Sequence, residues 1–161
     1  MQELKDRIVK EGKVLPGNII KVDGFLNHRI DTELMDHIAE EFGKHFNMDE
    51  VTMILTAEAS GIALSAIVAH HFHKPMIFAK KAKSDNIEGG LYQSDIFSYT
   101  YKKKVTLLVS KEWLSADEKV LIIDDFMANG EAMLRAAGVN LKSLAIIESA
   151  EPGNIVFRGE D

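Results

Sequence analysis

Cysteine is absent from the 161-residue sequence. A chain without thiols forms no disulfide bond and no thiolate metal site, and it is compatible with a reducing cytosol. The sequence also lacks any apolar run near the ~18 residues of a membrane span, and the charged stretch 1–7 has no signal-peptide core. We therefore expect a cytoplasmic protein that has no membrane partner.

The sequence has fewer basic than acidic residues. The 25 acidic and 19 basic residues leave a formal net charge of −6, which argues against a nucleic-acid partner. Internal repeats and low-complexity segments are absent as well, and a chain of this length fits one core. We expect a single domain over residues 1–161.

The chain is organised around residues 120–132, which read VLIIDDFMANGEA. The four leading apolar residues predict a strand buried on both faces, as in a parallel sheet. Asp124 and Asp125 follow at the carboxyl end of that strand, where open α/β folds bind ligands. The small residues after them predict a turn into a helix whose first amide groups lack backbone partners and attract phosphate.

The two halves of this stretch suit two parts of one ligand. Carboxylates accept hydrogen bonds from the vicinal hydroxyls of a ribose, or hold Mg²⁺ directly or through water. The amides of the following turn hold a phosphate, so a ribose 5-phosphate fits between them. Taken alone, Asp-Asp after a strand is more often helix capping than catalysis. A second strand, turn and helix start at residues 51–62 predicts another anion site by the same physics.

The full pattern of residues 120–132 resembles the motif with which type I phosphoribosyltransferases bind 5-phosphoribosyl 1-pyrophosphate (PRPP). That motif has four hydrophobic residues, two acids, three variable residues, a small residue, glycine, any residue and a small residue. This chain departs from it at Ala128, Asn129 and Ala132, where most members have Thr or Ser. Backbone amides, with the Asn129 side chain, must therefore hold the phosphate.

The resemblance implies an α/β fold, with a central parallel sheet flanked by helices and a small N-terminal hood at about residues 13–30. It also implies a loop at about 82–104 that closes over the reacting centre; the polar sequence there predicts a flexible arm or a hairpin. Beyond residue 133 the chain is shorter than the family norm by about one βα unit, with the join near residues 134–138. The sequence leaves open whether this is a real deletion or a gap in the sequence as printed.

Residues 21–28 and 122–132 together resemble the bacterial xanthine phosphoribosyltransferases. Members of that family join xanthine to PRPP with Mg²⁺, act as homodimers in purine salvage, and release xanthosine 5′-monophosphate and pyrophosphate. The resemblance implies that Asp124 and Asp125 are the catalytic residues, with Mg²⁺ bound to one of them through water, and that Ile20 and Asn27 contact the purine. It further implies PRPP contacts at Glu58, Ala59, Ser60, Gly61, Lys80, Lys81, Ala128, Asn129, Gly130, Glu131 and Ala132.

Other interpretations stay open at this point. Asn27 is equally explained as a turn residue, and the lysines as a solvated basic run. The same scaffold could take guanine, hypoxanthine or adenine, or serve as a PRPP-sensing regulator without catalysis. A metal site at His70, His71 and His73 is weaker, because no carboxylate or thiol lies close to them in the sequence.

Overall fold

The computed structural model describes residues 1–16, 19–81, 90–98, 103–126, 143–144, 146–150 and 154–158. Its elements, in chain order, are α1 (Gln2–Glu11), β1 (Lys13–Leu15), β2 (Ile19–Lys21), the π-helical turn η1 (Asp23–Asn27), α2 (Thr32–His45), β3 (Met53–Ala57), α3 (Gly61–His71), β4 (Met76–Ala79), β5 (Leu91–Ser98), β6 (Lys103–Ser110), β7 (Val120–Ile122), β8 (Ser143–Leu144), β9 (Ile146–Ala150) and β10 (Asn154–Arg158).

A parallel sheet forms the centre of the molecule, as the sequence predicts. Its strand order is β4-β3-β7-β8, and each neighbouring pair runs parallel. In the middle of the sheet, Leu55 pairs with Ile77 on one side and with Ile122 on the other. Because β3, β4 and β7 are parallel, their carboxyl ends meet at one edge of the sheet.

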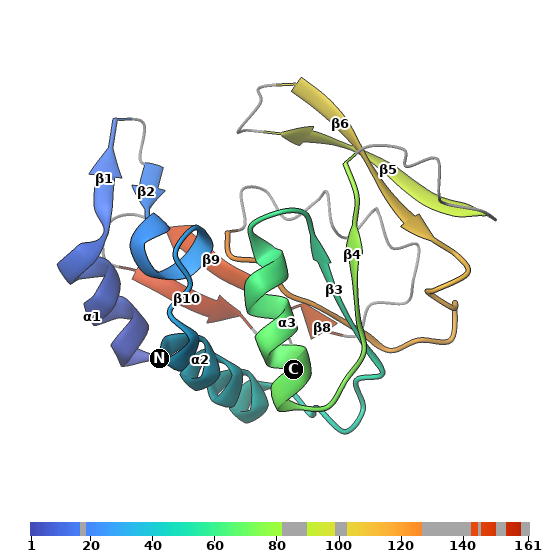
Figure 1. Cartoon of the computed structure of the whole chain (residues 1–161), viewed down its shortest axis with the longest axis horizontal. Helices are drawn as coiled ribbons and strands as arrows, with labels where there is room; N and C mark the ends of the chain where they lie inside the picture. The colour runs from blue at the N-terminus through green and yellow to red at the C-terminus, as the bar shows by residue number, and fades with distance from the viewer. Residues whose placement is uncertain are drawn as a thin grey trace.

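Both faces of this sheet are buried. Ile54, Leu121 and Ile123 belong to a hydrophobic cluster shared with α1, η1, α2 and α3. Their strand neighbours Leu55 and Ile122 belong to a second cluster, which includes residues of β6. This alternation is the period-two pattern of a strand, so the predicted burial of 120–123 on both faces is confirmed. Figure 1 shows α2 and α3 packed beside each other on the side of the first cluster.

The N-terminal hood is a short hairpin followed by a helical turn. Strands β1 and β2 pair antiparallel, with Val14 opposite Ile20. Residues 23–27 form the helical turn η1. Phe25 and Leu26 are adjacent and both buried in the first cluster. Successive side chains of a strand point to opposite faces, whereas a helical turn lets two neighbours enter one core.

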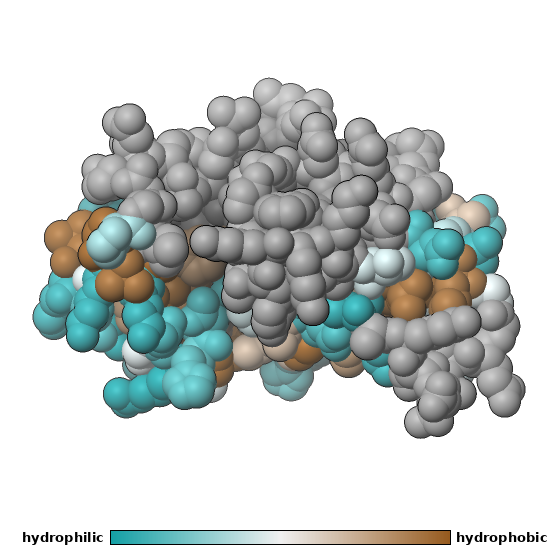
Figure 2. Space-filling view, turned by 90° about the horizontal axis from the view of Figure 1, so that it is seen from above, coloured by the Kyte–Doolittle hydropathy of each residue, from teal (hydrophilic) through white to brown (hydrophobic). Residues whose placement is uncertain are grey.

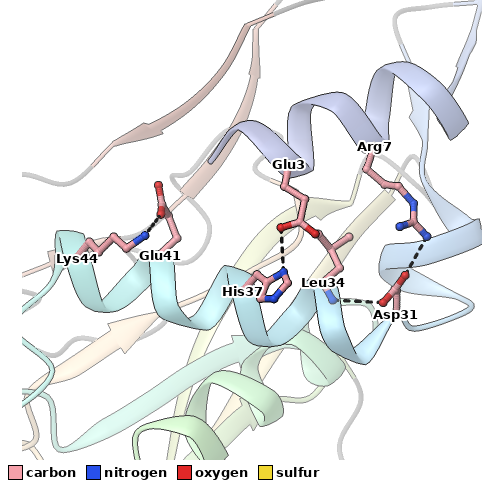
Figure 3. A network of polar contacts seen from close by, with 7 residues as sticks. All are labelled: Glu3, Arg7, Asp31, Leu34, His37, Glu41 and Lys44. Atoms are coloured by element: carbon pink, nitrogen blue, oxygen red, sulfur yellow. Dashed lines mark hydrogen bonds and ion pairs between the residues drawn. The ribbon is translucent and has the colours of Figure 1, made fainter.

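A seam of polar contacts fastens α1 along α2 (Figure 3). Arg7 pairs with Asp31 at 2.8 Å, His37 contacts Glu3 at 2.9 Å, and the N-terminal ammonium lies 3.4 Å from Glu41. Asp31 also caps α2, because its carboxylate accepts the backbone N–H of Leu34 at 3.2 Å. These contacts therefore fasten α1, the helix that leads into the hood, to α2.

In the predicted arm at 82–104, β5 pairs antiparallel with β6, which runs beyond the arm and lies next to β4 (Figure 1). Residues 82–89 and 99–102 lie outside the described residues. Strands β9 and β10 pair antiparallel. The predicted join at 134–138 also lies outside the described residues.

The exposed surface carries a small apolar group on the N-terminal unit, formed by Val9, Val14 and Leu15. Figure 2 shows apolar side chains at the left of the molecule, the side on which Figure 1 places β1. Within the described residues, no helix is long and apolar enough to cross a membrane.

Candidate active site

Three segments meet at the carboxyl edge of the parallel sheet. Asp124 and Asp125 follow β7, the turn 57–60 joins β3 to α3, and Lys80 and Lys81 follow β4. Parallel pairing brings these segments together, because a residue that follows one strand lies beside the residues that follow its neighbours. Each segment was selected from the sequence for its chemistry, and the fold places them at one edge.

Asp125 is the centre of the polar contacts at this edge. Its side chain is buried, with 4% of the residue exposed. One carboxylate oxygen, Oδ2, accepts a hydrogen bond from Asn27 Nδ2 at 3.0 Å, and the other, Oδ1, accepts one from Ser60 Oγ at 2.8 Å. The structure thus brings together three predicted residues: Asn27 from the hood, Ser60 from the turn after β3, and Asp125 from the segment that follows β7.

Asp124 lies beside it in a different environment. Its Oδ1 accepts the backbone N–H of Asp125 at 3.0 Å. The pKa of Asp124 is raised to about 8, mainly by burial and then by the negative charge of Asp125, while the charge of Lys81 opposes the rise. At neutral pH the Asp124 side chain is therefore mostly protonated.

The donor set of this edge fits Mg²⁺. Magnesium prefers oxygen ligands and is commonly held by one or two carboxylates together with the phosphates of a substrate. Two adjacent carboxyl groups, one of them kept neutral by its burial and by the charge of its neighbour, form such a partial site. Among the described residues, no three Asp, Glu, His or Cys side chains group so that they could hold a metal ion. His71 instead contacts Asp36, and the rings of His70 and His73 lie edge to face.

Gly61 leaves no room for a side chain at the start of α3. A Cβ atom there would overlap the hydroxyl of Thr56 and the carboxyl of Asp124. Thr56 is fully buried, and its Oγ1 finds no hydrogen-bond partner within the described part of the chain. Sequence reasoning missed Thr56. Its signal was a single hydroxyl at the end of an otherwise apolar strand.

The two lysines after β4 have different roles. The backbone N–H and C=O of Lys80 both pair with Leu108, in a bridge to β6. Lys81 is the residue whose charge lowers the pKa of Asp124, and its backbone N–H donates to Glu58 Oε1 at 2.6 Å. Glu58 therefore joins the turn after β3 to the end of β4, and its peptide bond to Ala59 is cis.

The remaining predicted contacts are only partly described. Ile20 lies on β2 and packs against the first hydrophobic cluster, so Asn27 is the predicted purine contact that reaches Asp125. The predicted phosphate turn, with its five residues, lies outside the described residues. Those residues are Ala128, Asn129, Gly130, Glu131 and Ala132.

Comparison with known proteins agrees with this geometry. A model of the phosphoribosyl transferase domain matches residues 25–144. A xanthine phosphoribosyltransferase of Lachnoclostridium phytofermentans is 44% identical over 193 residues, covering 99% of this chain and 100% of that protein. Another, from Bifidobacterium animalis subsp. lactis, is 43% identical over 192 residues, covering 98% of this chain and 100% of that protein.

The fold has relatives among solved structures. The crystal structure of an adenine phosphoribosyltransferase from Giardia lamblia in complex with 9-deazaadenine superposes with a TM-score of 0.69 at 24% identity. It covers 89% of this chain and 83% of that one. This likeness confirms the predicted fold class.

The alignments also bear on the length of the chain. An alignment over 193 residues exceeds the 161 of this chain, so at least 32 of its positions (193 less 161) have no counterpart here. That they fall in the C-terminal part stays a prediction. The parallel sheet, the carboxylate pair at its edge and these matches all agree. The chain belongs to the phosphoribosyltransferase family.

Proposed function

We propose that this protein is a purine salvage enzyme that converts xanthine and PRPP to xanthosine 5′-monophosphate and pyrophosphate. The observation that carries the proposal is the meeting of Asn27, Ser60 and Asp125 at one carboxylate. It joins the hood, the turn after β3 and the strand that ends in the PRPP motif. The near full-length relatives named xanthine phosphoribosyltransferase support the choice of purine.

The reaction asks the protein mainly for positioning and charge stabilisation. The bond from C1 of the ribose to the pyrophosphate oxygen breaks through an oxocarbenium-like state. A purine nitrogen forms the new bond to C1 and gives up its proton to the departing pyrophosphate. Asp125 accepts hydrogen bonds from ribose hydroxyls, which fixes C1 relative to the base. We assign the 5-phosphate to the backbone amides of residues 128–132.

The leaving group carries the negative charge that must be stabilised. Lys81 is the lysine we assign to the pyrophosphate, because its charge acts on Asp124 at this edge of the sheet. Bound Mg²⁺ would neutralise the pyrophosphate oxygens, with the Asp124–Asp125 pair as its protein ligands, directly or through water. Glu58 supports Lys81 by holding its backbone.

The purine is assigned to the hood. Asn27 uses one amide hydrogen on Asp125, which leaves its second N–H and its oxygen for one edge of the base. Ile20 supplies an apolar contact to the ring face. We further propose that the enzyme is a cytoplasmic homodimer.

The direct test is release of pyrophosphate from Mg²⁺ and PRPP in the presence of xanthine. Release that requires xanthine, and that Asp125→Ala abolishes, would support the proposal. Binding of PRPP without release, with any of the purines, would favour a PRPP-sensing regulator. Absence of PRPP binding would contradict both hypotheses, the enzyme and the PRPP-sensing regulator.

A further inference from the structure

We infer that Asn27 is a positioning residue for Asp125, so that PRPP binding depends on Asn27 even when no purine is present. The inference rests on the proposed function of the site and assigns Asn27 a second task there. The hood would then form part of the sugar site as well as the base site.

The geometry of Asp125 supports this role. A carboxylate has about four acceptor positions, two on each oxygen. Among the described residues, Asn27 donates to Oδ2 and Ser60 donates to Oδ1, so each oxygen has one such donor and keeps capacity to accept another. That remaining capacity suits the vicinal hydroxyls of a ribose. The two hydrogen bonds present fix the plane of the carboxylate and hence where those hydroxyls must lie.

The place of Asn27 is set by the hydrophobic core. It is the last residue of η1, directly after Phe25 and Leu26, which are 0% and 2% exposed. The Arg7 guanidinium lies 5.5 Å from the centre of the Phe25 ring and pairs with Asp31 at 2.8 Å. Buried anchors and a fastened α1 therefore hold Asn27 against Asp125 without help from a bound base.

The carboxylate also sets the orientation of the Asn27 amide. An ionised carboxylate only accepts hydrogen bonds, so the NH₂ group must face Asp125. The contact with Asp125 therefore fixes the orientation of the Asn27 amide before a purine binds to the rest of that amide. Binding of either ligand would favour binding of the other, and this coupling is reciprocal.

The test is the affinity for PRPP with Mg²⁺, measured by calorimetry without any purine. We expect Asn27→Ala to weaken PRPP binding about tenfold or more, the effect of losing one hydrogen bond to a charged group. The matched control is Asn47→Ala, which removes an exposed Asn whose Nδ2 donates to Glu50 Oε1 at 3.0 Å on the surface. The control should bind PRPP as the unmodified protein does.

A second variant separates positioning from loss of folding. Asn27→Asp keeps the size of the side chain but sets a carboxylate against that of Asp125, and we expect it to weaken PRPP binding more than Asn27→Ala does. Thermal unfolding of each variant confirms that it is folded. An unchanged PRPP affinity in folded Asn27→Ala, with only a raised KM for the purine, would overturn the inference. Failure of the unmodified protein to bind PRPP would instead overturn the proposed function.

Discussion

Gly61 approaches the carboxyl group of Asp124 so closely that a Cβ atom on Gly61 would overlap it. The same atom would overlap the hydroxyl of Thr56, at the end of β3. The start of α3 and the end of β7 therefore touch through a backbone that has no side chain. Because of this close approach, Ser60 in the turn after β3 lies within hydrogen-bond distance of Asp125.

Gly61→Ala should therefore damage both the fold and the site. Overpacking a buried contact lowers the free energy of unfolding by about 1–3 kcal/mol. Because the new methyl group would also displace Asp124, we expect the variant to bind PRPP more weakly. Thermal unfolding and PRPP calorimetry measure the two effects. Gly24→Ala is the control, because a Cβ on Gly24 meets nothing within 4 Å. Equal behaviour of the two variants would show that the contact does not matter.

Asp125→Ala should nearly abolish turnover. Removing a preorganised group at the reacting centre typically costs a factor of about 10²–10³ in kcat, and this change also leaves Asn27 and Ser60 without their acceptor. Steady-state release of pyrophosphate is the measurement. Asp117→Ala, at an exposed position, controls for loss of an acid elsewhere. Full turnover by Asp125→Ala would refute the assignment of Asp125.

Asp124 should make the protein less stable as the pH rises. Its pKa is about 8 in the folded chain against a usual 3.8, so the folded state keeps a proton that the unfolded state releases. Its contribution to stability is therefore full below about pH 4 and is lost progressively as the pH rises through 8. Asp124→Asn stays neutral at every pH. We expect its Tm to exceed that of the unmodified protein by a few degrees at pH 8.5.

That difference in Tm should close as the pH falls below 3.8, where both side chains are mostly neutral in both states. Thermal unfolding at a series of pH values measures it. Parallel curves for the two proteins would mean that Asp124 is ionised in the folded state, as an ordinary surface acid is.

Lys81 and Lys80 should differ in their effect on turnover. Lys81→Ala should lower kcat about 10–100-fold, because it removes the charge that we assign to the leaving pyrophosphate. It should also raise the pKa of Asp124 further, since Lys81 opposes that rise. Lys80→Ala should have the smaller effect, because its contacts to Leu108 are made by the backbone and survive the substitution. The opposite ranking in steady-state kinetics would move the assignment to Lys80.

Asp31 should anchor the hood through two different contacts. Hydrogen bonding from the backbone of Leu34 holds the pKa of Asp31 below its usual value, and Arg7 acts in the same direction. The stability that this group adds is present above its usual pKa and lost as the pH falls through the lowered one. Asp31→Ala should lower the Tm by several degrees at pH 7, whereas Asp31→Asn, which can still cap α2, should lower it less. Equal losses would assign the whole effect to Arg7.

Local patterns in the sequence were enough to predict the central sheet and its edge. Residues 120–123 are uniformly apolar, and only a strand buried on both faces accommodates them. Asp124 and Asp125 then had to lie at the carboxyl end of that strand. Helix α2 carries local signals as well, since Asp31 caps it and its buried apolar residues recur at helical spacing.

Contacts between distant parts of the chain were beyond such reasoning. The hydrogen bond from Asn27 to Asp125 joins residues 98 positions apart, and no local pattern encodes it. The helical turn η1 was missed because the sequence there has turn residues at both ends, while burial of Phe25 and Leu26 decides its conformation. The choice of Lys81 over Lys80 likewise needed the fold, which brings the charge of Lys81 near Asp124.

The central claim is that this protein attaches xanthine to the ribose of PRPP. The most direct measurement supplies PRPP and Mg²⁺ with xanthine, guanine, hypoxanthine or adenine, one at a time, and identifies the nucleotide product by chromatography. We predict that xanthosine 5′-monophosphate forms at the highest kcat/KM. Preferential formation of another purine nucleotide, or of no nucleotide at all, would contradict the claim.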